Sequence, residues 1–371
     1  MKLTIERAAL FRSLGHVQSI VERRNTIPIL SNVMLEATDG SLGLTATDMD
    51  IAIVESVPAV IDTGGSTTAP AHTLYDIVRK LPDGAQIELD SSSDGQMILR
   101  AGRSEFTLQT LPTEDFPQTD GGDLPHQFAL PANDLRGLID RTRFAISTEE
   151  TRYYLNGIFM HTAAGDSGDV MRSVATDGHR LARVEMPVPD GAAGMPGVIV
   201  PRKTVGELRK LIDEIGDDID IALSDTSARF AFDNAVLTSK LIDGTFPDYE
   251  RVIPTGNDKS LNVDCRSFAD AVDRVATIST EKSRAVKLTA AGNSLVLTAS
   301  SPDSGTAREE IEVDYDADAI EIGFNARYLL DIAQQIEGGE AEFVVADAAS
   351  PTIVRDSEDD SALYVLMPMR V

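Results

Sequence analysis

The stretch VATDGHRLA, residues 174–182, carries three side chains whose types and spacing could do acid/base chemistry. Asp177 and His179 are a candidate proton donor and acceptor, and Arg180 could bind an anion beside them. All three stand on a glycine-containing turn between apolar segments. The sequence offers no nucleophile elbow, P-loop, metal-ligand cluster or dinucleotide fingerprint to accompany them. We therefore expect no catalytic residues, no metal and no cofactor.

Composition indicates an acidic globular protein. The 371 residues predict two to four domains. Against 33 Lys and Arg stand 60 Asp and Glu, giving a formal charge of -27, while a 42% apolar fraction is enough for folded cores. No apolar run is long enough for a signal peptide or a membrane helix. The one cysteine, Cys265, excludes an intramolecular disulfide framework. We expect a cytoplasmic protein with no membrane partner.

The sequence is repeated three times. Similar segments, each with an alternating strand, a polar cap and an apolar stripe at helical spacing, occur at 1–14, 126–147 and 259–279. Strand pairs joined by turns follow each of them. A second helical pattern then occurs in each third, at 69–84, 200–216 and 324–339. The repeats predict an α+β fold of three tandem domains, each of two similar halves, with six helices on one side and antiparallel sheets on the other.

The expected domain boundaries and core positions follow from these repeats. Domain 1 is predicted at 1–120, domain 2 at 126–254 and domain 3 at 258–371. The apolar stripes predict buried helix faces at Leu10, Leu14, Val17 and Val21, at Leu74, Ile77, Val78 and Leu81, at Leu135, Leu138 and Ile139, at Phe268, Val272 and Val275, and at Leu329, Ile332 and Ile336.

Charge is distributed unevenly between helices and strands. The six helical segments with their flanks hold 18 of the 33 Lys and Arg but only 12 of the 60 Asp and Glu. A solvated helix face can be basic for solubility alone, but such faces usually mix both signs. The separation favours a surface that meets a polyanion, with salt-sensitive, non-specific binding. Without Trp, zinc-finger spacing or a basic recognition helix, base-specific reading is not expected.

Distinctive motifs occur along the whole chain, among them TIPIL (26–30), RYYLNG (152–157), ATDGHRLA (175–182), LTSKLIDGTFPDYERVIP (237–254) and the terminal YVLMPMRV. In this order and at these positions they resemble the motifs of the bacterial sliding clamps, the beta subunits of DNA polymerase III. The resemblance implies a non-catalytic protein whose two protomers close head to tail into a ring, with helices lining the hole. Such a ring would encircle duplex DNA without sequence preference and tether its partners to it. The implied partners are the polymerase alpha subunit, the clamp loader and other proteins with a clamp-binding motif.

The resemblance also implies three sets of site residues. DNA contacts fall on Arg24, Arg79, Arg152, Tyr153, Tyr154, Arg202 and Lys203. The protomer interface falls on Arg103, Phe106, Leu108, Ile278 and Glu309. A cleft for a glutamine- and leucine-containing peptide falls on Leu155, Thr176, Gly178, His179, Arg180, Leu181, Pro247, Arg251, Val252, Val365, Leu366, Met367, Pro368, Met369 and Arg370. Two departures from the family pattern stand out: Glu149 replaces an uncharged DNA-contacting residue, and Thr277 replaces a large aliphatic one.

Structural alternatives exist for each set. The tyrosines could cap a domain edge, Phe106 and Leu108 could face a core, and the Met-rich end could be a last core strand. For the whole chain, the alternatives are an acid/base enzyme built on Asp177 and His179 and an acidic scaffold without a DNA role. The repeats bear on the enzyme: 44–52 and 295–303 are counterparts of 174–182 but lack the His-Arg pair. We therefore interpret the turn as a structural element common to the three repeats, and its His-Arg-Leu sequence as a docking surface.

Overall fold

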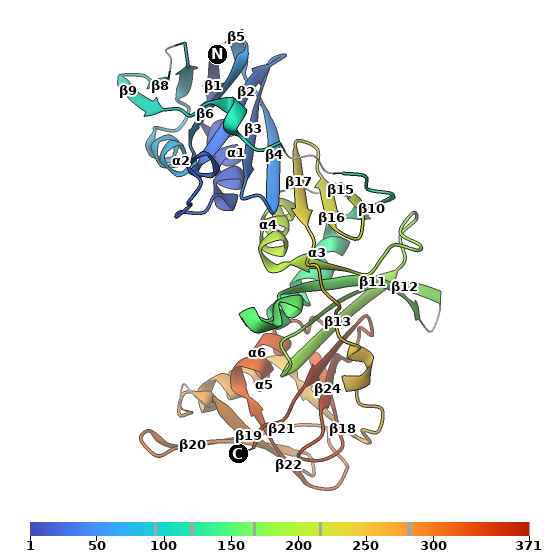
Figure 1. Ribbon diagram of the computed structural model, residues 1–371. Coiled ribbons are helices and arrows are strands. Elements are labelled where there is room, and N and C mark those ends of the chain that lie inside the picture. The colour runs from blue at the N-terminus through green and yellow to red at the C-terminus, as the bar shows by residue number, and fades with distance from the viewer. Residues whose placement is uncertain (93–94, 119–121, 166–167, 215–216, 280–283, 371) are drawn as a thin grey trace. The chain divides into compact units, whose positions relative to one another are not determined.

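The computed structural model describes residues 1–92, 95–118, 122–165, 168–214, 217–279 and 284–370, and its described strands all pair in antiparallel fashion (Figure 1). Every helical pattern expected from the sequence forms a helix in these residues. The α-helices are α1 (Arg7–Ile20), α2 (Ala71–Lys80), α3 (Ala132–Asp140), α4 (Arg202–Asp213), α5 (Cys265–Ala276) and α6 (Ala326–Ala333). Short 3₁₀ helices are η1 (Pro28–Ser31), η2 (Thr113–Asp115), η3 (Arg143–Ala145), η4 (Glu150–Leu155) and η5 (Tyr249–Val252). Within this part of the chain, none of the helices has the length and apolar character needed to cross a membrane.

The chain divides into two compact units, the first comprising Met1–Arg136, Pro189–Pro196 and Lys203–Leu241. Its larger sheet has eight strands in the order β10 (His126–Pro131), β15 (Asp218–Leu223), β16 (Ser227–Ala231), β17 (Ala235–Lys240), β4 (Ile51–Pro58), β3 (Ser41–Thr47), β2 (Asn32–Thr38) and β6 (Gly65–Pro70). Its smaller sheet has the order β5 (Val60–Thr63), β1 (Lys2–Glu6), β7 (Gln86–Asp90), β8 (Gln96–Ala101) and β9 (Ser104–Gln109).

The second unit comprises Gly137–Val188, Gly197–Arg202 and Ile242–Val371. Its larger sheet again has eight strands, in the order β14 (Val198–Pro201), β11 (Gly157–Gly165), β12 (Gly168–Thr176), β13 (Arg180–Pro187), β25 (Ala362–Leu366), β24 (Thr352–Asp356), β23 (Glu340–Val345) and β18 (Lys259–Asp264). Its smaller sheet has the order β21 (Gly305–Glu312), β20 (Ser294–Ser301), β19 (Ala285–Ala291) and β22 (Ile320–Asn325).

Each eight-stranded sheet joins strands from two sequence repeats. In the first unit β4 of the first repeat pairs with β17 of the second, with Ile53 opposite Leu237. In the second unit β13 of the second repeat pairs with β25 of the third, with Ala182 opposite Tyr364. The central repeat therefore contributes four strands to each sheet. Hydrogen bonds continue across the repeat boundaries, so neighbouring repeats are fused through their backbones rather than connected by a linker alone.

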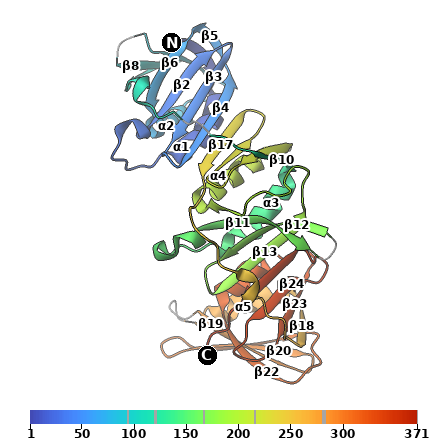
Figure 2. The ribbon, with the colours of Figure 1, turned by 45° about the vertical axis from the view of Figure 1, so that its right-hand side comes forward.

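The helices bury the apolar stripes expected from their sequences. Helix α1 packs on α2, β3 and β4 (Figures 1 and 2), with Leu10, Leu14 and Val17 fully buried. Burying such side chains contributes about 1.5 to 3 kcal/mol each. Two predicted stripe residues are exceptions: Ile77 is only half-buried on α2, and Ile336 is half-buried beyond the end of α6 at Ala333. The two glycines at 338 and 339, the second with φ 86°, follow closely and disfavour continuing the helix.

Candidate functional site

The turn at 176–180 is closed by its own side chains. Asp177 Oδ1 accepts hydrogen bonds from the backbone N–H groups of His179 (2.9 Å) and Arg180 (3.0 Å). Thr176 Oγ1 donates to the carbonyl of Arg180 at 2.7 Å and accepts from the N–H of Gly178. Gly178 has φ 87°, and a Cβ there would lie 2.5 Å from Arg152 Nη1. The Asp177 carboxylate thus holds the turn together, as expected for an Asx-type turn.

Arg180 is a buried structural residue. Its side chain is 7% exposed, and its guanidinium donates to Asp177, to Asp331 of α6 and to the carbonyl of Phe144. It also lies over the rings of Tyr328 and Phe144, at 4.3 and 5.0 Å from their centroids. Each of its three guanidinium nitrogens thus already donates a hydrogen bond to an acceptor within the protein. The suggestion that Arg180 binds an anion beside an Asp177–His179 acid/base pair is therefore wrong. Within the predicted cleft, the Arg180 side chain lies below the surface.

We expect Arg180→Ala to lower the free energy of unfolding by about 2 to 4 kcal/mol, because it leaves Asp331 and the Phe144 carbonyl without their partner. Urea denaturation followed by circular dichroism measures the change. Arg180→Lys is the matched control: it keeps the charge but not the planar fork, so an intermediate loss is expected. Equal urea midpoints for wild type and Arg180→Ala would contradict this structural role.

The predicted cleft residues divide into a buried floor and a surface rim, all within the second unit. The floor is Leu155, Arg180, Leu181, Val365 and Leu366, none more than 7% exposed. Exposed rim residues are Gly178, His179, Pro247, Arg251, Val252, Met367 and Arg370, and half-buried ones are Thr176, Pro368 and Met369. Leu155, Leu181 and Val365 belong to one apolar cluster with Phe246 and Tyr249. The structure thus gathers residues that are far apart in the sequence.

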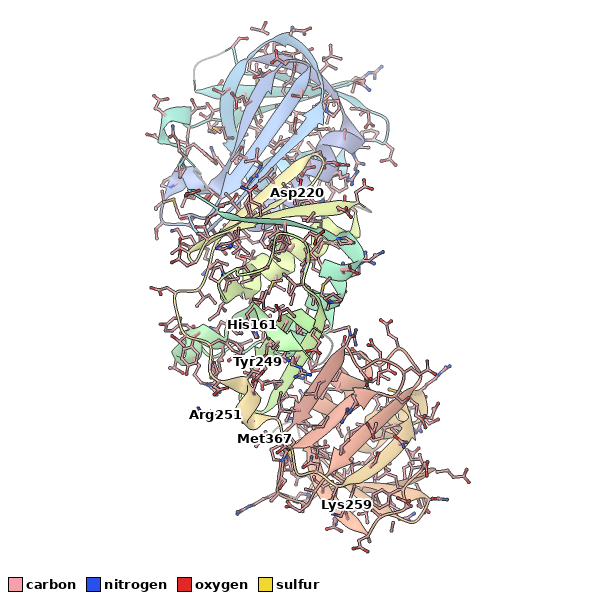
Figure 3. The ribbon with its side chains drawn as sticks, turned by 90° about the vertical axis from the view of Figure 1, so that its right-hand side faces the viewer. His161, Asp220, Tyr249, Arg251, Lys259 and Met367 are labelled. Carbon is pink, nitrogen blue, oxygen red and sulfur yellow. The ribbon has the colours of Figure 1, made fainter. Side chains whose placement is uncertain are left out.

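Two backbone hydrogen bonds tie the chain end to this region. The N–H of Met367 donates to the carbonyl of His179 at 2.9 Å, and that of Met369 donates to Gly323 at the same distance. Met367 and Val252 remain 40% and 48% exposed, which is high for apolar side chains of their size. Figure 3 labels Met367, Arg251 and Tyr249 in this part of the molecule. Apolar side chains held at the surface by a rigid backbone suit recognition of another chain.

Helix η5, which carries Arg251 and Val252, is anchored by a network that the sequence reading missed. Tyr249 Oη lies 3.0 Å from His161 Nε2 and accepts from Arg172 Nη1 at 3.3 Å. Arg172 is 7% exposed and also pairs with Glu185 and Glu250. Burial raises the pKa of the Tyr249 hydroxyl, so it stays neutral. Arg172, at a core-facing position of strand β12, is the sequence feature that could have predicted this network, since a buried arginine requires partners.

The predicted DNA-contacting cations differ in their present partners. The Lys203 ammonium contacts Glu22 Oε1 and Asp48 Oδ2, both at 2.6 Å, and the carbonyl of Ile20. Arg152 forms a two-point ion pair with Glu149, which lowers the pKa of that carboxyl group. Arg79 pairs with Asp76 at 3.1 Å.

The other members of this set are more available. Arg24 and Arg202 are exposed, and no carboxylate partner is found for either among the described residues. Tyr153 is 54% exposed and packs edge to face on Tyr154, which lies against the apolar cluster. Of the predicted set, Arg24, Arg202 and Tyr153 are thus exposed at the surface, whereas Lys203 and Arg152 are held in ion pairs.

The residues predicted at the protomer interface lie on or near two sheet edges. Strand β9 is the last strand of the smaller sheet in the first unit, and β21 is the last strand in the second. On β9, Leu108 is 8% exposed and faces the core, Phe106 is half-buried and Arg103, before the strand, is exposed. Ile278 is half-buried just after α5. Glu309 on β21 already forms a two-point ion pair with Arg274.

The repeated α+β halves, fused through shared antiparallel sheets, define a three-domain DNA-clamp fold. Models of the DNA polymerase III beta subunit match its N-terminal domain at residues 1–120, its central domain at 129–248 and its C-terminal domain at 250–370. The chain belongs to this family, the bacterial beta sliding clamps.

Relatives and solved structures agree over the full chain. The beta sliding clamps of Caulobacter vibrioides and Escherichia coli K12 are 57% and 39% identical, with complete coverage of both chains in each comparison. The crystal structure of the Caulobacter crescentus clamp matches with a TM-score of 0.98 at 57% identity, covering 100% of this chain and 99% of that one. A Bartonella birtlesii clamp bound to griselimycin matches with a TM-score of 0.97 at 52% identity, with full coverage of both chains.

Family membership establishes the function. The chain is a sliding clamp that confers processivity on DNA polymerase III, and it is non-catalytic. As such it acts in DNA replication and binds DNA and polymerase. The enzyme and acidic-scaffold alternatives are therefore set aside. Among the described residues, no group of three or more His, Cys, Asp or Glu is placed to hold a metal ion.

Proposed function

We propose that two copies of this chain close head to tail into a ring around duplex DNA and hold partner proteins through a peptide-docking surface. The docking surface consists of the rim residues His179, Pro247, Arg251, Val252 and Met367, above the buried floor. The observation that carries the proposal is this exposed apolar rim, tied to the chain end by the hydrogen bond from Met367 to His179. Ring closure supplies the tether to DNA, and the rim supplies the tether to the polymerase.

The edges of the two smaller sheets are compatible with ring closure. Strands β9 and β21 each end one of these sheets, as β5 and β22 do at the opposite ends, and an edge strand presents backbone groups that can pair with another chain. A head-to-tail contact that pairs β9 of one copy with β21 of the other covers both edges and closes after two copies. Phe106 and Ile278 are the apolar contacts that we assign to it, and Arg103 and Glu309 the charged ones. Thr277 is exposed and adds little apolar area.

DNA contact in the ring is electrostatic and non-specific. We assign it to Arg24, Arg202 and Tyr153 directly, to Arg79, Arg152 and Lys203 after they exchange carboxylate partners for phosphate, and to Tyr154 beside Tyr153. Phosphate contacts alone give dissociation constants of roughly 10⁻⁴ to 10⁻⁶ M. Such contacts let a ring slide, because retention comes from closure and not from affinity.

The docking surface takes an extended peptide that contains glutamine and leucine. The Met side chain of the rim is flexible and polarizable, which suits a surface shared by several partners. We assign it to the polymerase alpha subunit, the clamp loader and other proteins with a clamp-binding motif, all acting in the cytoplasm.

Retention on nicked circular DNA tests the ring. Once loaded, the protein is expected to stay on the circle through gel filtration at high salt and to leave when a restriction enzyme linearises it. Closed topology predicts both results, whereas phosphate contacts alone predict loss at high salt from either DNA. Equal retention on circular and linear DNA would contradict the proposal.

A further inference from the structure

The first unit contains a second copy of the turn that presents His179. In residues 47–51, Thr47 Oγ1 donates to the carbonyl of Ile51 at 2.9 Å, as Thr176 does to Arg180. Asp48 Oδ1 accepts from the N–H groups of Asp50 (3.0 Å) and Ile51 (2.8 Å), as Asp177 does from its own turn. The two turns therefore share their side-chain closure as well as their place in the repeat.

The neighbouring strand end is also repeated. The N–H of Lys240, at the end of β17, donates to the carbonyl of Asp50 at 2.7 Å. In the docking surface the N–H of Met367 makes the same bond to His179. The pairing register agrees too, with Ile51 opposite Ser239 where Arg180 stands opposite Leu366. The backbone frame of the docking surface thus occurs once in each unit.

Met49 occupies the position of Gly178 in this second frame. Its φ is 82°, close to the 87° of Gly178, although a side chain disfavours this region of backbone conformation. The side chain is nevertheless 50% exposed, so no core contact accounts for a strained methionine. Strained residues that persist at a surface are concentrated at binding sites. The strained, exposed Met49 therefore indicates that the repeated frame in the first unit has a binding role of its own.

A hollow of about 250 Å³ lies beside Met49. We call it the junction hollow; it is lined by Thr47, Met49, Ile51, Ala52, Pro117 and Thr238, among others. Its volume is below the 300 to 1,000 Å³ of typical small-molecule sites, so it suits one or two side chains of a longer ligand. Pro117 follows Phe116 there as Pro247 follows Phe246 in the docking surface.

The rim of the junction hollow has a different chemistry from the docking surface. Where the docking surface has His179 and Met367, the junction hollow has Asp50 and Lys240, which form an exposed ion pair at 3.1 Å. Such a pair contributes little and opens easily. Once the pair opens, Lys240 can bind a carboxylate on one side of a bound segment and Asp50 can bind a cation on the other side. With no aromatic lining and with Asp50 at the rim, the junction hollow is poorly suited to a nucleic-acid strand.

We propose that the junction hollow is a second, weaker docking site for the same class of linear peptide. It rests on the proposed function, because it assumes that the repeated frame docks peptides in the second unit. The occupant is an extended segment that places one aliphatic side chain against Met49 and Ile51. Its flanking charges pair with Lys240 and Asp50. A partner with two such segments could then be held at two points on one protomer, which raises its effective affinity without new chemistry.

Peptide titration into a variant with a blocked docking surface tests the proposal. The probe is a fluorescein-labelled, nine-residue peptide with capped ends that contains one glutamine, two leucines, a glutamate on one flank and a lysine on the other. Val252→Asp with Met367→Lys places charges on the rim and blocks that site. This variant is expected to retain a weak binding phase, roughly 10- to 100-fold weaker than wild type, that shifts the methyl NMR signals of Ile51 and Ala52.

Further variants assign the weak phase. Adding Met49→Asp is expected to abolish it, whereas Val60→Asp, at a valine of the same unit that is 68% exposed against 50% for Met49, is expected to leave it unchanged. Met49→Gly is the most informative change: it relieves the backbone strain, so Tm should not fall, yet it removes the apolar contact and should weaken the phase. Loss of binding together with a lowered Tm would overturn the role of Met49 as a surface contact.

Failure of this proposal is distinguishable from failure of the docking surface. If the blocked variant binds no peptide while wild type binds one per protomer, the junction hollow is overturned and the docking surface stands. If the blocked variant binds as tightly as wild type and shifts Ile51 and Ala52, the docking surface is overturned and the junction hollow stands. A weak phase that single-stranded DNA displaces, but unlabelled peptide does not, would overturn the assignment to a peptide.

Discussion

Deleting residues 367–371 is expected to weaken binding of a glutamine- and leucine-containing peptide by at least about 100-fold, because central anchor residues of an interface each contribute 2 kcal/mol or more. Met367 is 40% exposed and supplies the apolar rim. The cut falls after Leu366, the fully buried last residue of β25, so the core strand stays intact. Val371 lies outside the described residues, and the expected effect does not depend on it. Surface plasmon resonance with immobilised peptide measures the loss.

The matched controls separate docking from folding. The truncated protein loses the backbone hydrogen bonds from Met367 to His179 and from Met369 to Gly323, but all the described strands and the proposed ring contacts remain. It should therefore keep its Tm within a few degrees and remain on nicked circular DNA. Val252→Asp alters the part of the rim that η5 carries, without removing any of the chain, and should give a loss of similar size. Undiminished peptide affinity in both variants would show that the docking surface lies elsewhere.

Local signals in the sequence predicted the helices and the repeated turn. Apolar spacing placed all six helices, because a stripe such as Leu10, Leu14 and Val17 reflects only the geometry of one helix. The turn at 174–182 was matched to 44–52 from the sequence. The structure gives both turns the same closure by Thr and Asp side chains. These features depend on residues within one or two turns of each other.

Long-range pairing decided what the sequence could not predict. The repeats predicted three tandem domains, and they gave no signal that β4 would pair with β17 and β13 with β25, so that each large sheet crosses a repeat boundary. Whether a charged residue is buried, and which partner it meets, depends on such long-range pairing. Arg180 looked like a surface residue, yet α6 brings Asp331 to it and buries it. Lys203 meets Asp48, 155 positions earlier in the chain, and a linear reading has no means to pair them.

The protein's charge separation has a physical use in the proposed ring. A chain with a net charge of -27 repels DNA at a distance, and the helical segments hold most of its cations. In the proposed ring, two of these cations are already paired: Lys203 and Arg152 keep their carboxylate partners until a DNA phosphate competes for them. The Arg152–Glu149 pair is exposed and costs little to break, whereas the Lys203–Asp48 pair is partly buried and costs more. Contact with DNA can therefore form and dissolve as the ring slides.

Changing Phe106 and Ile278 to alanine is expected to shift the protein from dimer to monomer in analytical ultracentrifugation at low micromolar concentration. A head-to-tail ring of two copies has two identical interfaces, so each substitution acts twice and its free-energy cost is doubled. If each contact contributes about 1 to 2 kcal/mol, the summed cost is about 4 kcal/mol or more, and the dissociation constant of the dimer rises roughly 1,000-fold or more. Leu108 is left unchanged because it faces the core, where truncation would destabilise the fold itself.

Val60→Ala is the matched control for this double variant, since Val60 is 68% exposed on β5, at the opposite edge of the same sheet. It should leave the dimer intact. The double variant should keep the far-ultraviolet circular dichroism of the wild type but lose retention on circular DNA, because a monomer cannot close around it. A dimer that persists would exclude β9 as an interface edge. Conversely, a monomer that is still retained on circles would separate DNA binding from ring closure.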